Sequence, residues 1–225
     1  IAAQHVVKAR ENFTKWGKAQ LEDLEISETE WLASETCKLA WRARHPATVR
    51  FWFGLQDAVK MAISNRGLIY DAGPYIKARC VTHAGLPWLV VLLPNKRCLT
   101  YFDPQLVDSK GKPYTAQELQ IDEIRRKASI TYMGEASEQG STTRAWIRVH
   151  THGGKMTGNV CQTLARDQLA PAMSDAEAAG IEPVLSVHDE IVAEVDIGRG
   201  YEELAQIMSA NRWWNPGLPL AAAGF

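Results

Sequence analysis

The sequence predicts an α+β fold, in which a mainly helical N-terminal part precedes a small antiparallel sheet packed with helices. Three observations predict this class. Apolar residues recur at helical spacing through the first 66 residues. Two pairs of short apolar runs follow, and each pair is separated by a turn-forming segment, as in hairpins. A long helical pattern starts near Lys155, between the two pairs.

Composition bounds the class of protein. The 225 residues are 46% hydrophobic and 23% charged, which is typical of a globular chain and argues against disorder. The net charge of -1 gives no overall attraction for nucleic acid, so DNA binding would need a local basic surface. The longest apolar run, residues 88–93, is too short to span a membrane. The four cysteines lack zinc-ligand spacing, so we expect reduced thiols.

Helix signals organise the N-terminal part. Ser27 and Glu30 fit a capping box, in which the two side chains satisfy backbone N–H groups at a helix start. The helix that follows is expected to end near Arg44, because the residue before Pro46 disfavours the α conformation. Pro46 suits the first turn of a second helix, which we expect to end by residue 66.

The first strand pair, residues 86–93 and 98–102, is expected to form a hairpin. Three further segments follow it: a turn-rich stretch at 103–115, a helix at 116–127, and a polar mobile loop at 135–143.

The second strand pair, residues 184–187 and 191–195, carries the strongest local signal. His188-Asp189-Glu190 forms the tight connection, so two adjacent carboxylates occupy the tip of a hairpin. Carboxylate oxygens are preferred ligands of Mg²⁺, which also takes ligands from substrate phosphates. The same tripeptide equally fits an ordinary solvated turn, so the pattern alone does not establish a metal site.

The long helix has two distinct faces. Pro171 is expected to end or kink it, because proline removes the backbone bond to residue 167. Its apolar face is Met156, Val160 and Leu164. Its polar face is Lys155, Asn159, Gln162 and Arg166. Cations bind phosphates, and amides can donate to minor-groove acceptors, so this face suits DNA. An ordinary solvated helix face has the same composition.

Several segments together resemble the late palm segment of phage-type DNA polymerases of family A (DNA polymerase I-like). The most specific are Gly153-Gly154-Lys155, Asn159, Gln162, Ala165-Arg166-Asp167 and Val187-His188-Asp189-Glu190. Others agree in order: Trp41-Arg42-Ala43-Arg44-His45-Pro46, Arg50-Phe51-Trp52, Leu93-Pro94 with Arg97, Tyr132-Met133-Gly134, Trp146 and Gly217-Leu218-Pro219-Leu220. The resemblance covers nearly the whole chain.

The resemblance implies a role for each matching residue. Asp189 matches a catalytic metal ligand, Glu190 its acidic neighbour, and His188 the residue that contacts the primer-terminal nucleotide. Gln162, with Asn159 and Lys155, matches the helix face that contacts duplex DNA in the minor groove. The implied cofactor is a pair of Mg²⁺ ions, and the implied partners are primer-template DNA and deoxynucleoside triphosphates.

The sequence also departs from the family pattern. Residue 158 is Gly, where relatives often have an acidic residue. Lys96 stands where the first hairpin usually has Gly, so we expect Asn95 to take the left-handed conformation. Neither the first polymerase motif, with its metal-binding aspartate, nor the fingers helix is recognisable, and family order places both upstream of Ile1.

We therefore expect a helical segment at 1–66 that follows the fingers helix, and a palm subdomain at 67–225 with the catalytic hairpin at 184–195. Alone, the chain is expected to be inactive and to require an N-terminal polymerase part, on the same precursor or a separate chain. The expected location is the cytoplasm of a bacterial host, with a phage or prophage gene.

Two other functions stay open. One is a non-catalytic DNA-binding or assembly remnant of such a polymerase. The other is a metal-dependent phosphohydrolase that uses His150, His152, His188 and Asp189, which predicts a compact metal site within this chain.

Overall fold

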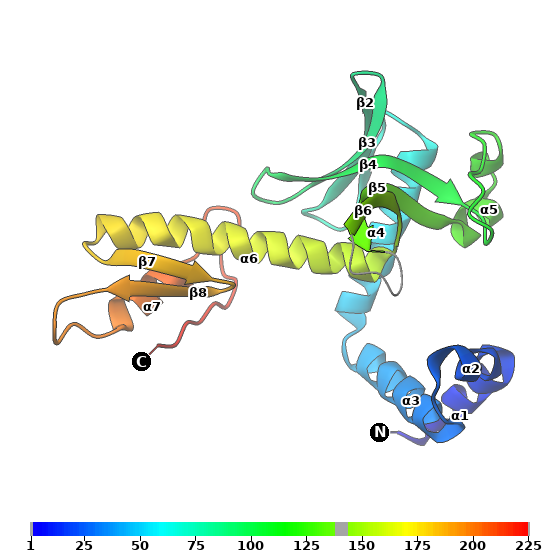
Figure 1. Cartoon of the computed structure of the whole chain (residues 1–225), viewed down its shortest axis with the longest axis horizontal. Helices are drawn as coiled ribbons and strands as arrows, with labels where there is room; N and C mark the ends of the chain where they lie inside the picture. The colour runs from blue at the N-terminus through cyan, green and yellow to red at the C-terminus, as the bar shows by residue number, and fades with distance from the viewer. Residues whose placement is uncertain (1, 138–143, 225) are drawn as a thin grey trace. The chain divides into compact units, whose positions relative to one another are not determined.

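The computed structural model describes residues 2–137 and 144–224, and is shown in Figure 1. The chain divides into two compact units, Ile1–Phe53 and Gly54–Phe225, which are described separately. The division falls within helix α4 (Pro46–Ser64), whereas the sequence placed a boundary after residue 66. Helices and an antiparallel sheet are both present, so the predicted α+β class is confirmed.

The first unit is helical, as predicted. Its helices are α1 (Ala3–Asn12), a π-helical turn (Phe13–Gly17), a 3-10 turn (Lys18–Gln20), α2 (Leu21–Leu24), α3 (Glu28–Arg44) and the first part of α4. The capping box of Ser27 and Glu30 is formed, and α3 ends at Arg44. Trp31 is buried against Phe13, with ring centroids 5.4 Å apart, and this aromatic contact forms the small core of the unit.

The second unit contains a six-stranded antiparallel sheet in the order β1-β2-β3-β4-β5-β6 (Figure 1). Its strands are β1 (Ile69–Asp71), β2 (Lys77–His83), β3 (Leu86–Leu92), β4 (Cys98–Val107), β5 (Ser129–Ser137) and β6 (Arg144–Thr151). The predicted hairpin of residues 86–93 and 98–102 is confirmed as β3 and β4. Alternate residues such as Leu89 and Val91 are buried, as are Leu55 and Val59 of α4, so helix and sheet share one core.

Strand β4 is longer than predicted. It runs to Val107, with a bulge between Phe102 and Gln105, so the expected turn-rich stretch begins only after the strand. At the bulge Asp103 has a φ of 45°, a left-handed conformation that is uncommon outside glycine. Arg148 donates to the Asp103 carbonyl over 3.0 Å and pairs with its carboxylate. A partner from β6 therefore stabilises a strand that its own sequence does not favour.

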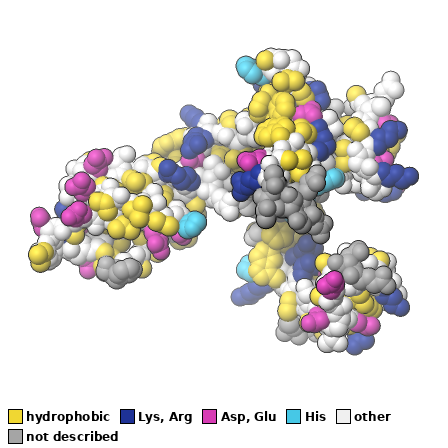
Figure 2. All heavy atoms as spheres, in the orientation of Figure 1, with side chains coloured by type: hydrophobic (Ala, Val, Ile, Leu, Met, Phe, Trp, Pro, Cys, Tyr) yellow, Lys and Arg dark blue, Asp and Glu magenta, His cyan; other side chains and the backbone are white. Residues whose placement is uncertain are grey.

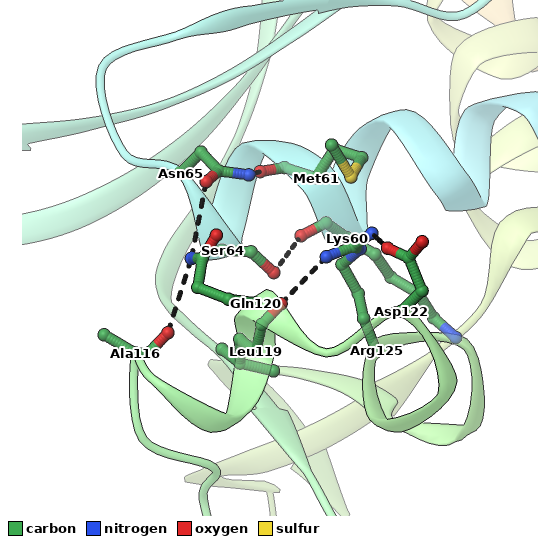
Figure 3. Close-up of polar contacts among 9 residues, drawn as sticks. All are labelled: Lys60, Met61, Ser64, Asn65, Ala116, Leu119, Gln120, Asp122 and Arg125. Carbon is green, nitrogen blue, oxygen red and sulfur yellow. Dashed lines mark hydrogen bonds and ion pairs between the residues drawn. The ribbon is translucent and has the colours of Figure 1, made fainter.

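The predicted helix at 116–127 is two short helices, a 3-10 turn (Glu118–Gln120) and α5 (Asp122–Lys127), because Ile121 between them is extended. Figure 3 shows how this region meets α4. The Gln120 amide donates to Asn65 Oδ1 over 3.5 Å. Arg125 donates to the Leu119 carbonyl over 2.8 Å and pairs with Asp122. Of the loop expected at 135–143, residues 135–137 belong to β5, and 138–143 lie outside the described residues.

Helix α6 (Gly153–Ala178) is the long predicted helix. It begins at the glycine pair, because His152 caps it: Nδ1 accepts from the backbone N–H of Gly154 over 3.1 Å and of Lys155 over 3.4 Å. Pro171 lies inside the helix, so of the two outcomes expected there, an end or a kink, the end is wrong.

The second predicted hairpin is confirmed as β7 (Glu182–Val187) and β8 (Glu190–Glu194), which form a two-stranded sheet separate from the six-stranded one. Helix α7 (Glu202–Ser209) follows, and α6 contacts both α7 and β7. All four cysteines are free, and Cys80 is buried. In the described part of the chain, no helix has both the length and the apolar character needed to cross a membrane.

Candidate nucleic-acid interface and metal-binding hairpin

The β7–β8 hairpin presents the acidic residues at its tip. Val187 pairs with Glu190, so His188 and Asp189 alone form the turn and Glu190 is already the first residue of β8. His188 has a φ of 54°, the left-handed conformation that tight two-residue turns need. All three polar residues are exposed. Both carboxylates are therefore open to solvent and are held by a paired backbone.

The two carboxylates at this tip are the type of ligand that Mg²⁺ binds, but they are too few to hold the ion by themselves. Carboxylate oxygens are the hard ligands that Mg²⁺ takes. Within residues 2–137 and 144–224, no three His, Cys, Asp or Glu side chains are grouped closely enough to hold a metal ion. His152 is engaged in capping α6. The compact metal site that a phosphohydrolase using His150, His152, His188 and Asp189 requires is therefore not formed by the described residues.

The polar face of α6 borders an open pocket of about 360 Å³. The helix contributes Asn159, Gln162, Thr163, Arg166 and Asp167, and the β3–β4 hairpin contributes Arg97 and Leu99. Three of the four predicted DNA-contacting residues thus line one depression. The fourth, Lys155, is exposed one turn earlier on the helix and is not part of the lining. Figure 2 shows Lys and Arg side chains gathered over the middle of α6.

Asn159 is held by the sheet. Its amide Nδ2 donates to the hydroxyl oxygen of Tyr101 over 3.0 Å. Tyr101 is buried in β4, and this burial raises the pKa of its hydroxyl. A buried tyrosine hydroxyl usually finds a hydrogen-bond partner. The sequence signal for this contact is therefore the position of Tyr101 inside a predicted strand, which implies a buried hydroxyl but does not identify its partner. The bond orients the Asn159 amide against the sheet.

Asp167 anchors the β3–β4 turn to α6. Its carboxylate is buried and accepts hydrogen bonds from Asn95 and Arg97. The left-handed residue of this turn is Lys96, with a φ of 67°, so the expectation that Asn95 takes that conformation is wrong. Asn95 instead uses its side chain twice, since Oδ1 also accepts from the Arg97 backbone N–H over 3.1 Å. These bonds place Arg97 beside the polar face of α6.

The end of α7 and the segment that follows it fix the middle of α6. Gln168 donates to the carbonyl oxygens of Met208 and Ala210, over 3.1 and 2.8 Å. The buried Asn215 in turn donates to Gln168 Oε1 over 3.1 Å. Gln162 makes no such bond within the described contacts and is exposed. The two glutamines of α6 therefore differ, because one is engaged in the fold and the other is available to a ligand.

Comparison with known proteins bears on this site. The chain is 33% identical over 198 residues to the DNA polymerase of Bacillus phage SP02. The chain is related to a phage DNA polymerase. The match covers 83% of this chain and 25% of the relative, so the chain spans about a quarter of that polymerase. No family model matches the chain. No solved structure matches it.

Proposed function

We propose that this chain is the C-terminal part of a template-directed DNA polymerase of family A, and that residues 67–225 contribute to its palm. The similarity to the phage DNA polymerase carries the proposal. Two features of the second unit support it: adjacent exposed carboxylates at a hairpin tip, and a helix whose polar face borders an open basic pocket.

In this proposal Asp189 and Glu190 supply one half of the ligands for two Mg²⁺ ions. Bound Mg²⁺ would stabilise negative charge on the attacking and leaving oxygens of nucleotidyl transfer. The hairpin backbone holds both carboxylates in place, which limits the reorganisation that binding requires. His188, at the same tip, is assigned to the primer-terminal nucleotide. The remaining essential carboxylate comes from outside this chain.

The polar face of α6 binds the primer-template duplex. Gln162 and the remaining N–H of Asn159 can donate to the acceptors that every base pair presents in the minor groove. Lys155 and Arg166 neutralise backbone phosphates. Arg97, which lines the same pocket and is paired with Asp167, adds further N–H donors beside Arg166. Such contacts recognise duplex geometry more than sequence, as a replicative enzyme requires.

Primer extension tests the proposal. The chain would be assayed with Mg²⁺ and all four nucleotides, alone and after joining to the remaining part of its polymerase. Extension is expected only in the joined enzyme, because the triphosphate otherwise lacks its cationic groups and the metals lack ligands. Asp189→Ala in the joined enzyme is expected to abolish extension, while Glu194→Ala, at the far end of strand β8, leaves it unchanged.

Each contrary result has a clear meaning. Extension by the chain alone, or by the joined Asp189→Ala enzyme, would place the metal site at other residues. Duplex binding without extension in every mixture would identify a non-catalytic DNA-binding remnant instead.

A further inference from the structure

A second pocket shares no lining residue with the first. It has a volume of about 240 Å³ and is lined by nine residues from α4, the end of α5, the start of β5 and the end of β6. Lys60, Arg126, Lys127 and His152 are among the nine, and none is Asp or Glu. We call this cavity the Lys60 pocket. Its lining is cationic in a chain whose net charge is close to zero.

Lys60 is the unusual member of this set. The residue is 5% exposed, and lysine is almost never this buried without a partner of opposite charge. Nζ donates to the Arg126 carbonyl over 2.7 Å. Within the described residues no carboxylate lies within ion-pair distance of Nζ. Burial lowers the pKa of this amine, and the nearby Asp57 offsets the effect only in part.

The other groups of the pocket also present donors. His152 Nδ1 accepts two backbone N–H groups at the start of α6, so the proton of the neutral ring lies on Nε2, which can donate. Arg126 is exposed and its guanidinium makes no hydrogen bond among the described residues. Lys127 is partly neutralised by Glu123, 2.8 Å away. Arg125, by contrast, already bonds to the Leu119 carbonyl and pairs with Asp122, so it is not available to a ligand (Figure 3).

We propose that the Lys60 pocket binds a phosphate group. A compact, multiply charged oxyanion would supply the counter-charge that buried Lys60 lacks and would accept hydrogen bonds from several donors at once. The group could be free inorganic phosphate or a backbone phosphate of bound nucleic acid. The competing explanation is purely structural, with Lys60 acting only as a cap on the last carbonyls of α5.

The free-phosphate arm titrates inorganic phosphate into the 225-residue chain by calorimetry, at constant ionic strength with chloride. Arg126→Gln and Lys60→Met are expected to bind at least about tenfold more weakly than the wild type, the loss of one charge-assisted hydrogen bond. Lys110→Gln removes an exposed cation that does not line the pocket and is expected to bind normally. Circular dichroism checks that each variant is folded, and Arg126→Gln alters only an exposed side chain.

The nucleic-acid arm measures binding of a labelled duplex without terminal phosphates. If the pocket binds a backbone phosphate, Arg126→Gln lowers the affinity for the duplex and reduces the slope of log K against log salt by about one. Inorganic phosphate is then also expected to compete with the duplex. If free phosphate is the source, duplex binding is the same in wild type and variant. The proposal is overturned if Arg126→Gln and Lys60→Met change neither arm, which the capping explanation predicts. The free-phosphate arm is independent of polymerase activity, so the two proposals can fail separately.

Discussion

The amide of Asn159 in α6 donates a hydrogen bond to the hydroxyl of Tyr101 in β4, with 3.0 Å between Nδ2 and Oη. The bond joins the helix proposed to bind DNA to the six-stranded sheet. One amide N–H and the carbonyl oxygen of Asn159 are left for a ligand. A rigid connection of this kind is how a folded scaffold lowers the cost of ordering a binding side chain.

The buried hydroxyl of Tyr101 makes the free energy of unfolding fall as pH rises in the alkaline range. Burial raises its pKa above the ordinary value of 10.0, while the unfolded hydroxyl titrates near that value. The contribution of Tyr101 is therefore full below about pH 10 and is lost as pH rises through the folded pKa. Urea unfolding of Tyr101→Phe is expected to show a shallower loss of stability above about pH 10 than the wild type. Tyr75→Phe, at a residue 71% exposed, is the control and should follow the wild type; identical slopes for all three would contradict the prediction.

The two glutamines of α6 are expected to separate binding from folding. Gln162→Ala should weaken duplex binding by about 1–3 kcal/mol, the cost of a lost buried hydrogen bond, with unchanged thermal stability. Gln168→Ala should lower stability by about 1–2 kcal/mol, because the carbonyls of Met208 in α7 and of Ala210 just after it lose their donor, with nearly unchanged duplex affinity. Fluorescence anisotropy and thermal melts measure the two quantities. Equal duplex affinity of Gln162→Ala and the wild type would show that this face is only solvated.

Asp167 is expected to hold the β3–β4 turn on α6. Asp167→Ala removes an acceptor whose side chain is 4% exposed, and leaves Asn95 and Arg97 without it. We expect a loss of about 1–3 kcal/mol in the free energy of unfolding, together with faster amide exchange in the turn. Asp122→Ala breaks an ion pair whose carboxylate is 81% exposed, and should change stability by less than about 0.5 kcal/mol. If the two variants lose equal stability, Asp167 is not an anchor.

Pro171 is expected to cost stability in α6. It lies inside the helix at an exposed position and cannot donate to the carbonyl of Asp167. Pro171→Ala should therefore raise the free energy of unfolding by about 1–3 kcal/mol, measured by chemical denaturation. Pro219→Ala, in the irregular tail, should change it much less. A destabilised Pro171→Ala variant would mean that proline is needed for the local geometry.

Local patterns in the sequence determined most of the elements and their starts. The Ser27–Glu30 box, the break before Pro46 and the two hairpins depend on neighbouring residues and on backbone sterics, which act within a few positions. The α+β class followed from these same periodicities. The polar face of α6 was also local, since residues three and four apart on a helix are neighbours. Three members of that face do share one pocket.

Only the tertiary structure decided where a strand or helix continues through residues that would normally end it. Strand β4 continues through Asp103 because Arg148, forty-five residues later in the chain, pairs with that residue. Helix α6 continues past Pro171 because burial on both sides, at Leu169 and Ala172, outweighs one missing hydrogen bond. The Tyr101, Asp167 and Lys60 contacts join segments that are distant in sequence. Their energies depend on burial and on a partner from another element, and neither quantity can be read from the residues alone.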